Sequence, residues 1–109
     1  MKKLVMVVFG GESWEREGSI ISASAVARSL DRQRIKNRLV EFPVREIDLA
    51  NKDVGVFNSM HGKNGEDGTL SALCESFGVP YNFSTAFAHA VGFDKLRFKS
   101  LALSLGIQI

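Results

Sequence analysis

The sequence predicts an α/β fold: an open, mostly parallel sheet in three layers, with helices on both faces. Short runs of apolar, β-branched residues, typical of strands buried on both faces, alternate with longer segments whose apolar residues recur at helical spacing. Their order along the chain is strand, helix, strand, strand, helix, strand, helix. Parallel strands need crossover connections of this kind, so the order and the patterning predict the same fold class.

The predicted strands are short. Residues 4–9 form a continuous apolar run and are expected to be the first strand. Residues 38–42 and 54–60 follow as the second and third strands, each ending in a polar loop, and residues 79–81 form a brief fourth. The stretch over residues 48–53 is expected to be irregular.

The first helix is expected over residues 17–30. Ile20, Ala23, Ala27 and Leu30 recur there at helical spacing. The alanines and serines between them are small enough to let the helix lie close to a sheet.

The later helices are marked by the residues at their ends. One begins near Asp67 and ends where Gly78 can adopt the left-handed conformation of a C-cap. Ser84 can cap a brief helix, and Asp94 can cap another that Gly106 closes.

Length and charge exclude several classes of protein. A chain of 109 residues is expected to form one domain. Its 14 basic and 12 acidic side chains give a net charge of +2, too small for a nucleic-acid-binding protein. The basic run from Arg28 to Arg38 lacks interleaved aromatic residues and is interpreted as a solvated surface.

Cysteine usage and hydropathy predict a cytoplasmic protein. The single cysteine, Cys74, cannot form an internal disulfide, and it lies on an apolar helical stripe, which favours burial over reactivity. The apolar run near the N-terminus is too short for a secretory signal, and no stretch approaches the roughly 20 apolar residues that span a bilayer. We therefore expect no membrane partner.

The first polar loop, residues 10–19, is rich in glycine and glutamate. It permits a tight turn from strand to helix, but it lacks the full dinucleotide-binding fingerprint and the lysine of a P-loop. Glu12, Glu15 and Glu17 would repel a phosphate and attract a cation such as an ammonium group. The alternative is that these carboxylates are solvated and stabilise the start of the helix.

The second polar loop begins where the third strand is expected to end. His61 is followed by Gly62, Gly65 and Gly68, a density of glycine that lets backbone approach a ligand closely beside a titratable ring. The alternative is a structural histidine bonded to loop backbone, with Glu66 and its neighbour capping the next helix.

Five short motifs follow one another along the chain. They read GGxSxERExS at residues 10–19, HGxxGEDGxLSA at 61–72, GVPY at 78–81, DKxxxK at 94–99 and GI at 106–107. Together they resemble the N-terminal part of the D-alanine-D-alanine ligases, over essentially the whole chain.

The resemblance implies a Rossmann-like pre-ATP-grasp domain over residues 1–109. In the family, ATP phosphorylates the carboxylate of one D-alanine, and the amine of a second attacks the acyl phosphate to give the dipeptide for peptidoglycan. The central and C-terminal ATP-grasp domains, which supply most of the ATP and Mg²⁺ ligands, lie outside this sequence. The chain alone is therefore expected to be inactive, its reading frame to continue, and a homodimer to form.

The resemblance also implies residue roles. Glu15 would hold the ammonium of the first D-alanine as the catalytic and substrate-binding residue, and His61 would help to place that substrate. Lys95 would reach toward the ATP phosphates from the domain boundary, and no metal ligand is expected in this chain. The residues expected to brace the two loops are Gly10, Gly11, Ser13, Gly65 and Glu66, the last also capping the helix that follows.

Four residues depart from the family pattern: Gly18 replaces an aliphatic residue, Phe83 and His89 stand in the stretch where the family has a Gly-Ser-Gly-like turn, and Phe93 replaces a methionine. Two alternatives stay open. One alternative to a D-alanine-D-alanine ligase domain is a freestanding α/β binding or interaction module derived from such a ligase. The other is part of a paralogous ligase with a different amino-acid substrate.

Overall fold

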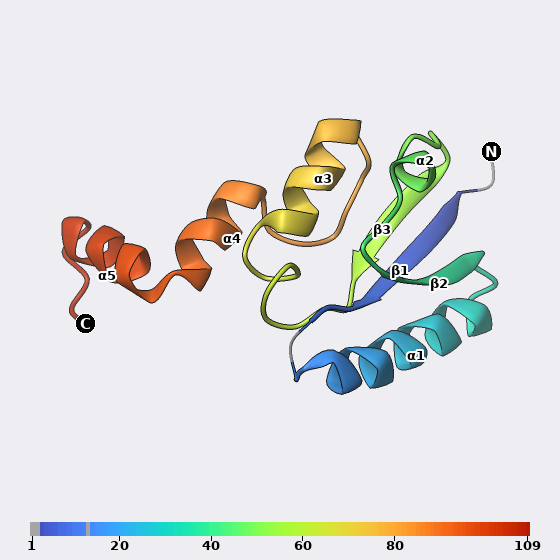
Figure 1. The fold of residues 1–109 in the computed structure, drawn as a ribbon, viewed down its shortest axis with the longest axis horizontal. Helices are drawn as coiled ribbons and strands as arrows, with labels where there is room; N and C mark the ends of the chain where they lie inside the picture. Colours follow the sequence, from blue (N-terminus) through green and yellow to red (C-terminus); the bar gives the residue numbers. More distant parts are fainter. Residues whose placement is uncertain (1–2, 13) are drawn as a thin grey trace.

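A parallel sheet with the strand order β2-β1-β3 forms the centre of the molecule (Figure 1). The structure is a computed structural model that describes residues 3–12 and 14–109. In it, β1 (Leu4–Gly10) pairs in parallel with β2 (Asn37–Phe42) on one side and with β3 (Val54–Asn58) on the other. The predicted α/β fold class with an open parallel sheet is confirmed.

One face of the sheet is covered by α1 (Arg16–Arg32), which packs against β1 and β2 (Figure 1). Ser19 and Ala23 are buried on this helix, and their small side chains allow its axis to lie close to the strands. The helix extends beyond the predicted residues 17–30 at both ends.

The other face of the sheet carries the main apolar core, under α2 (Glu46–Leu49) and α3 (Thr69–Phe77). Met6 and Val8 point into this core, while Val7 between them points to the α1 side, because successive side chains of a strand alternate. The core residues are Met6, Val8, Val44, Leu49, Val54, Val56, Met60, Leu70, Cys74 and Val79.

Two sequence expectations for the segments around β3 differ from the structure. The third strand ends at Asn58 rather than at residue 60, because the Asn58 side chain accepts the Met60 backbone N–H (2.9 Å) and turns the chain. The stretch 48–53, expected to be irregular, contains the end of the short helix α2, which places Leu49 in the core at 1% exposure.

The predicted fourth strand, residues 79–81, is wrong as a strand. Only an isolated parallel bridge joins Val56 to Tyr81, with the Val56 N–H donating to the Pro80 carbonyl (2.9 Å). Proline has no N–H to continue a ladder, so the pairing stops there. Instead, Tyr81 donates its hydroxyl hydrogen bond to Glu75 Oε1 (2.6 Å), which ties this segment to α3 and raises the pKa of Tyr81 to about 12.

The last two helices confirm the predicted ends with one correction. α4 (Ala86–Phe93) is capped by Thr85, whose Oγ1 accepts the Ala88 N–H (3.2 Å), and not by Ser84, whose carbonyl is held by the Ser71 hydroxyl. α5 (Lys95–Ser104) is capped by Asp94 as predicted, through bonds from two backbone N–H groups.

The C-terminal helices project away from the sheet (Figure 1). α4 packs on α3, and α5 packs mainly on α4 rather than on the sheet. The radius of gyration is therefore 15.3 Å, larger than the roughly 13 Å of a compact chain of this length. The chain is less compact than the single domain that its length predicts.

Cys74 is fully buried on α3, as the apolar stripe predicts. Burial, assisted by the neighbouring Glu75 carboxylate, raises the pKa of the thiol to about 11. At pH 8 about one thiol in a thousand is therefore ionised. We expect a disulfide reagent such as DTNB to react with the native chain at least about 100-fold more slowly than with the urea-unfolded chain. Equal rates would show that this helix does not shield the thiol.

Candidate functional site

The two polar loops meet at one edge of the sheet, where β1 and β3 end. These strands are parallel neighbours with Val8 opposite Asn58, so the segments that follow them leave on the same side. A Cβ on Gly11 would lie 3.3 Å from Met60 Cε, and Glu12 Oε2 lies 3.9 Å from Lys63 Nζ. The loops that the sequence singled out separately are thus one surface.

The first loop is held by a buried hydrogen bond to the start of α1. The Gly10 N–H donates to Ser19 Oγ (2.9 Å), and the Ser19 hydroxyl donates to the Arg16 carbonyl (2.6 Å). Gly10 has φ = 106°, a conformation that favours glycine. The sequence motif of this loop includes Ser19 but assigns it no role. A serine in the first turn of a helix, on the side that faces the sheet, is the sequence feature that indicates such a brace. Ser13, expected to brace this loop, lies outside the described residues.

Glu15 stands immediately before α1 and partly exposed. Its backbone carbonyl accepts the Ser19 N–H (3.1 Å), which fixes the start of the helix. Residues three and seven positions further on, Gly18 and Ser22, lie on the same helix face. Glu15, Gly18 and Ser22 therefore form a stripe along one face of α1, and this face lies opposite the second loop.

The second loop is anchored by Asn58, a residue that the sequence analysis did not single out. Its amide Nδ2 donates to the Gly65 carbonyl (2.8 Å), while its Oδ1 accepts the Met60 N–H. Gly65 is buried, and a Cβ there would overlap Met60 Cβ, so only glycine fits. An asparagine at the end of a buried strand is the sequence signal for this anchor.

Asp67, rather than Glu66, secures the start of α3. One carboxylate oxygen accepts the Asn64 N–H (3.0 Å), and the other accepts the Thr69 N–H (3.1 Å). Partial burial of Asp67 opposes its ionisation, but these hydrogen bonds outweigh it and lower its pKa. The cap assigned to Glu66 is thus corrected, because Gly68 occupies the N-cap with φ = 97° and Asp67 supplies the bonds.

His61 joins the second loop to the α1 stripe. Its Nδ1 lies 3.7 Å from Glu66 Oε1, and its Nε2 lies 3.5 Å from Ser22 Oγ. The ring is 44% exposed, so it is held in place yet remains reachable from solvent. The structure therefore places His61 and Glu66 together, beside the face of α1 that starts at Glu15.

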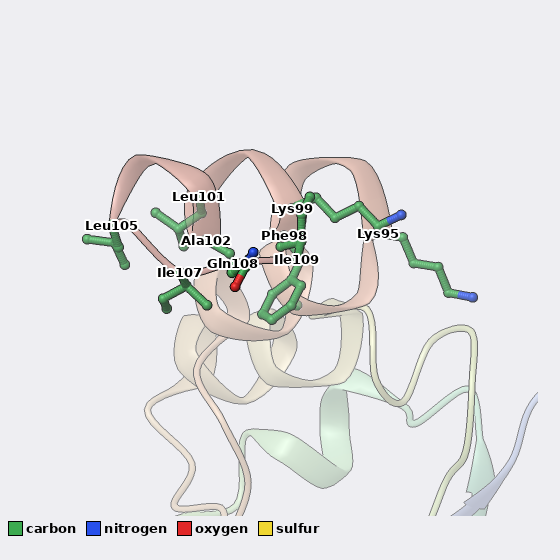
Figure 2. A pocket seen from close by; sticks show the side chains of 10 residues that line it. Lys95, Phe98, Lys99, Leu101, Ala102, Leu105, Ile107, Gln108 and Ile109 are labelled. Carbon is green, nitrogen blue, oxygen red and sulfur yellow. The ribbon is translucent and has the colours of Figure 1, made fainter.

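Lys95 lies apart from this place, at the start of α5. It borders an apolar pocket of about 420 Å³ between α5 and the C-terminal tail, together with Phe98 and Lys99 (Figure 2). Figure 2 shows the side chains of Leu101, Leu105 and the tail gathered around the same space.

Phe83 and His89, two departures from the family pattern, lie on the α4 side of the second loop. The Phe83 ring centre is 4.6 Å from that of Tyr81 and 6.2 Å from that of His89. His89 borders a pocket that Glu66 also lines, and its buried Nε2 has no hydrogen-bond partner among the described residues. His89 therefore lies near Glu66, on the α4 side of the second loop.

Residues 3–12 and 14–109 contain no group of three or more histidine, cysteine, aspartate or glutamate side chains that could hold a metal ion. In the same residues no helix has the length and apolar character needed to cross a membrane.

Comparison with known proteins supplies relatives for this chain. No protein-family model matches it. The D-alanine-D-alanine ligase of Chromohalobacter salexigens is 40% identical over 106 residues, which make up 94% of this chain and 33% of the relative. The ligase of Paramagnetospirillum magneticum is 37% identical over 115 aligned positions, covering 100% of this chain and 37% of the relative. The chain is a relative of the D-alanine-D-alanine ligases.

Solved ligase structures share the fold. A D-alanine-D-alanine ligase from Bacillus anthracis superposes with a TM-score of 0.84 at 28% identity, over 97% of this chain and 36% of that one. The VanG D-Ala:D-Ser ligase from Enterococcus faecalis superposes with a TM-score of 0.77 at 26% identity. The chain spans about a third of the length of the curated ligases it matches. The resemblance drawn from the loop motifs is thereby confirmed.

The Asp67 carboxylate gives a pH-dependent test of the second loop. We expect Asp67→Ala to lower the free energy of unfolding by about 1–2 kcal/mol at pH 7, because two backbone N–H groups lose their acceptor. Since the folded pKa is lowered, the charged form stabilises the fold above pH ~4, and this contribution is lost as pH falls through the folded value. Urea unfolding at pH 7 and pH 3 measures the difference.

Asp67→Asn is the matched control. Its amide keeps one acceptor oxygen but cannot titrate, so it should cost less at pH 7. A gap between the wild-type chain and Asp67→Ala that stays equal at both pH values would contradict the ionised role of Asp67.

Proposed function

We propose that this chain is the N-terminal, substrate-side domain of an ATP-dependent D-alanine-D-alanine ligase, which joins two D-alanines for peptidoglycan. One observation carries the proposal: similarity to ligases of that name runs through 94–100% of the chain at 37–40% identity. The two loop motifs fall within it, and they meet at the carboxyl edge of the sheet, where parallel α/β folds bind their ligands.

In this proposal Glu15 binds the ammonium of the first D-alanine, and His61 helps to position that substrate. A carboxylate at the end of the α1 stripe is suited to a cation, and Ser22 links the same stripe to the histidine ring. The braces around them are buried and rigid, while Glu15 and His61 stay partly exposed. Fixed orientation of this kind supplies much of the rate in a two-substrate condensation.

ATP would activate the carboxylate of the first D-alanine by phosphorylation, and Mg²⁺ would accompany it. A solved relative from Bacillus anthracis is a complex with ATP. The described residues offer little for either group: Lys95 is exposed at the start of α5, and no metal-holding cluster is found among them. We therefore assign ATP and Mg²⁺ mainly to ATP-grasp domains outside residues 1–109, with Lys95 reaching a phosphate.

The exposed apolar surface of α5 and the tail supports such further domains. Leu96, Leu103 and Leu105 are 58–76% exposed, and Ile107 and Ile109 are 55% and 64% exposed. A contiguous apolar surface of this kind marks an interface rather than a solvated face. We propose that the ATP-grasp domains cover it. A homodimer and a cytoplasmic location remain predictions from the resemblance.

Glu15 can be tested in a fusion in which this chain replaces the matching third of the Chromohalobacter salexigens ligase. We expect Glu15→Gln to raise the KM for the first D-alanine about 10- to 100-fold, because a charge-assisted hydrogen bond to the ammonium is lost. D-alanine-dependent phosphate release and dipeptide formation are the measurements.

Glu12→Gln is the matched control, since Glu12 lies in the same loop and is 82% exposed beside Lys63. It should leave the kinetics unchanged. An unchanged KM in Glu15→Gln would remove the assigned role, and a fusion that folds but never turns over D-alanine would favour a freestanding binding module.

The α5 surface gives a second test. We expect Leu96→Ser with Leu105→Ser to change the stability of the isolated chain by less than about 0.5 kcal/mol, because both side chains are exposed. In the fusion the same pair should cost several-fold more, since the ATP-grasp domains would bury them. Urea unfolding of both proteins measures this, with the exposed Ile21→Ser on α1 as control. Equal costs in the two proteins would show that nothing covers the surface.

A further inference from the structure

Gly18 lies on α1 between the two groups assigned to the substrate. It is three residues after Glu15 on the same helix face, a separation of about 5–6 Å between neighbouring side chains. A Cβ built on Gly18 would lie 4.0 Å from His61 Cδ2. Ser22, one turn further, has its Oγ 3.5 Å from the other end of that ring.

Neither backbone nor packing requires glycine at this position. Gly18 is not among the glycines with positive φ, and it lies inside the first turn of a regular helix. The separation of 4.0 Å from His61 is ordinary van der Waals contact, so an alanine would fit. Glycine also lowers helix stability relative to alanine. The glycine therefore costs stability here without satisfying any packing constraint from residues 3–12 and 14–109.

Gly18 is exposed, and without a Cβ the gap between α1 and the His61 ring is wider by one methyl group than it would be with alanine. An amino acid whose ammonium is held at Glu15 has its Cα one bond from that nitrogen and its side chain one bond further. Because residue 18 lies between Glu15 and His61 along α1, the side chain of such a substrate would be within reach of residue 18.

We propose that Gly18 widens the subsite for the first amino acid, so that this chain accepts D-amino acids with side chains larger than methyl. The inference rests on the proposed function, because it takes Glu15 as the ammonium site. It assigns specificity to α1, and not to Phe83 and His89, whose rings pair with each other on the α4 side of the second loop.

The test uses the fusion with the remainder of the Chromohalobacter salexigens ligase and an equal mixture of D-alanine and D-2-aminobutyrate. The substrate whose carboxylate is activated becomes the N-terminal residue of the dipeptide, so tandem mass spectrometry reads which one occupied this subsite. We expect the unsubstituted fusion to place both amino acids there to a similar extent. Gly18→Ala should lower the share of D-2-aminobutyrate about tenfold, and Gly18→Val should lower it further.

Gly92→Ala is the matched control. Gly92 also lies in a helix, and a Cβ there would meet nothing within 4 Å among the described residues, so the same substitution is made on α4 instead of on α1. It should leave the ratio unchanged. A ratio that neither Gly18 variant moves would overturn the inference while the proposed ligase function stood.

A fusion that folds but does not join D-alanine would count against the proposed function. The inference about Gly18 is then tested by amino-acid binding to the isolated chain. Titration with each amino acid, followed by amide NMR, should shift residues 15–22 and 61–66, more strongly with D-2-aminobutyrate. Gly18→Ala should reverse that preference. An unaltered preference, or the absence of shifts in both segments, would overturn it.

Discussion

The candidate site depends on the parallel pairing of β1 with β3. The register sets Val8 opposite Asn58, and the ladder continues past β3 through the bond from the Ser59 N–H to the Val8 carbonyl (2.9 Å). Both loops consequently leave the sheet at the same height. A slip of one residue would turn Met6 and Val8 out of the core and Val7 into it, so core packing fixes the register that positions the loops.

The residues that brace the two loops are of a different kind from those that we propose to face a substrate. Ser19 and Gly65 are buried, and with Asn58 they use hydrogen bonds and close backbone packing to fix the loops. Glu15 and His61 are partly exposed at the rim. A rigid buried support with reachable polar groups is the arrangement that a binding site requires, because the support holds the geometry and the rim meets the ligand.

The C-terminal helices pack differently from the helices that cover the sheet. α3 closes the core of the sheet, but α5 packs mainly on α4 and leaves several of its apolar side chains exposed. A chain of this length buries a limited core, and here part of its apolar surface is left over. The elongated shape and this surface both support the proposal that further domains cover α5.

The sequence by itself determined the fold class, the three strands of the sheet, the helix ends at Gly78, Asp94 and Gly106, and the two loops, because periodicity, glycine and capping residues are local signals. The family resemblance also followed from it, since the motifs are contiguous. Tertiary structure decided the rest. Pro80 reduced the fourth strand to a bridge, Asp67 took the role expected of Glu66, and Asn58 and Ser19 became the braces of the loops. Each of these outcomes depends on a partner distant in sequence or on competition between neighbours for one N–H group. Which acceptor binds each N–H group is decided only when the chain packs, and packing alone places His61 beside Gly18.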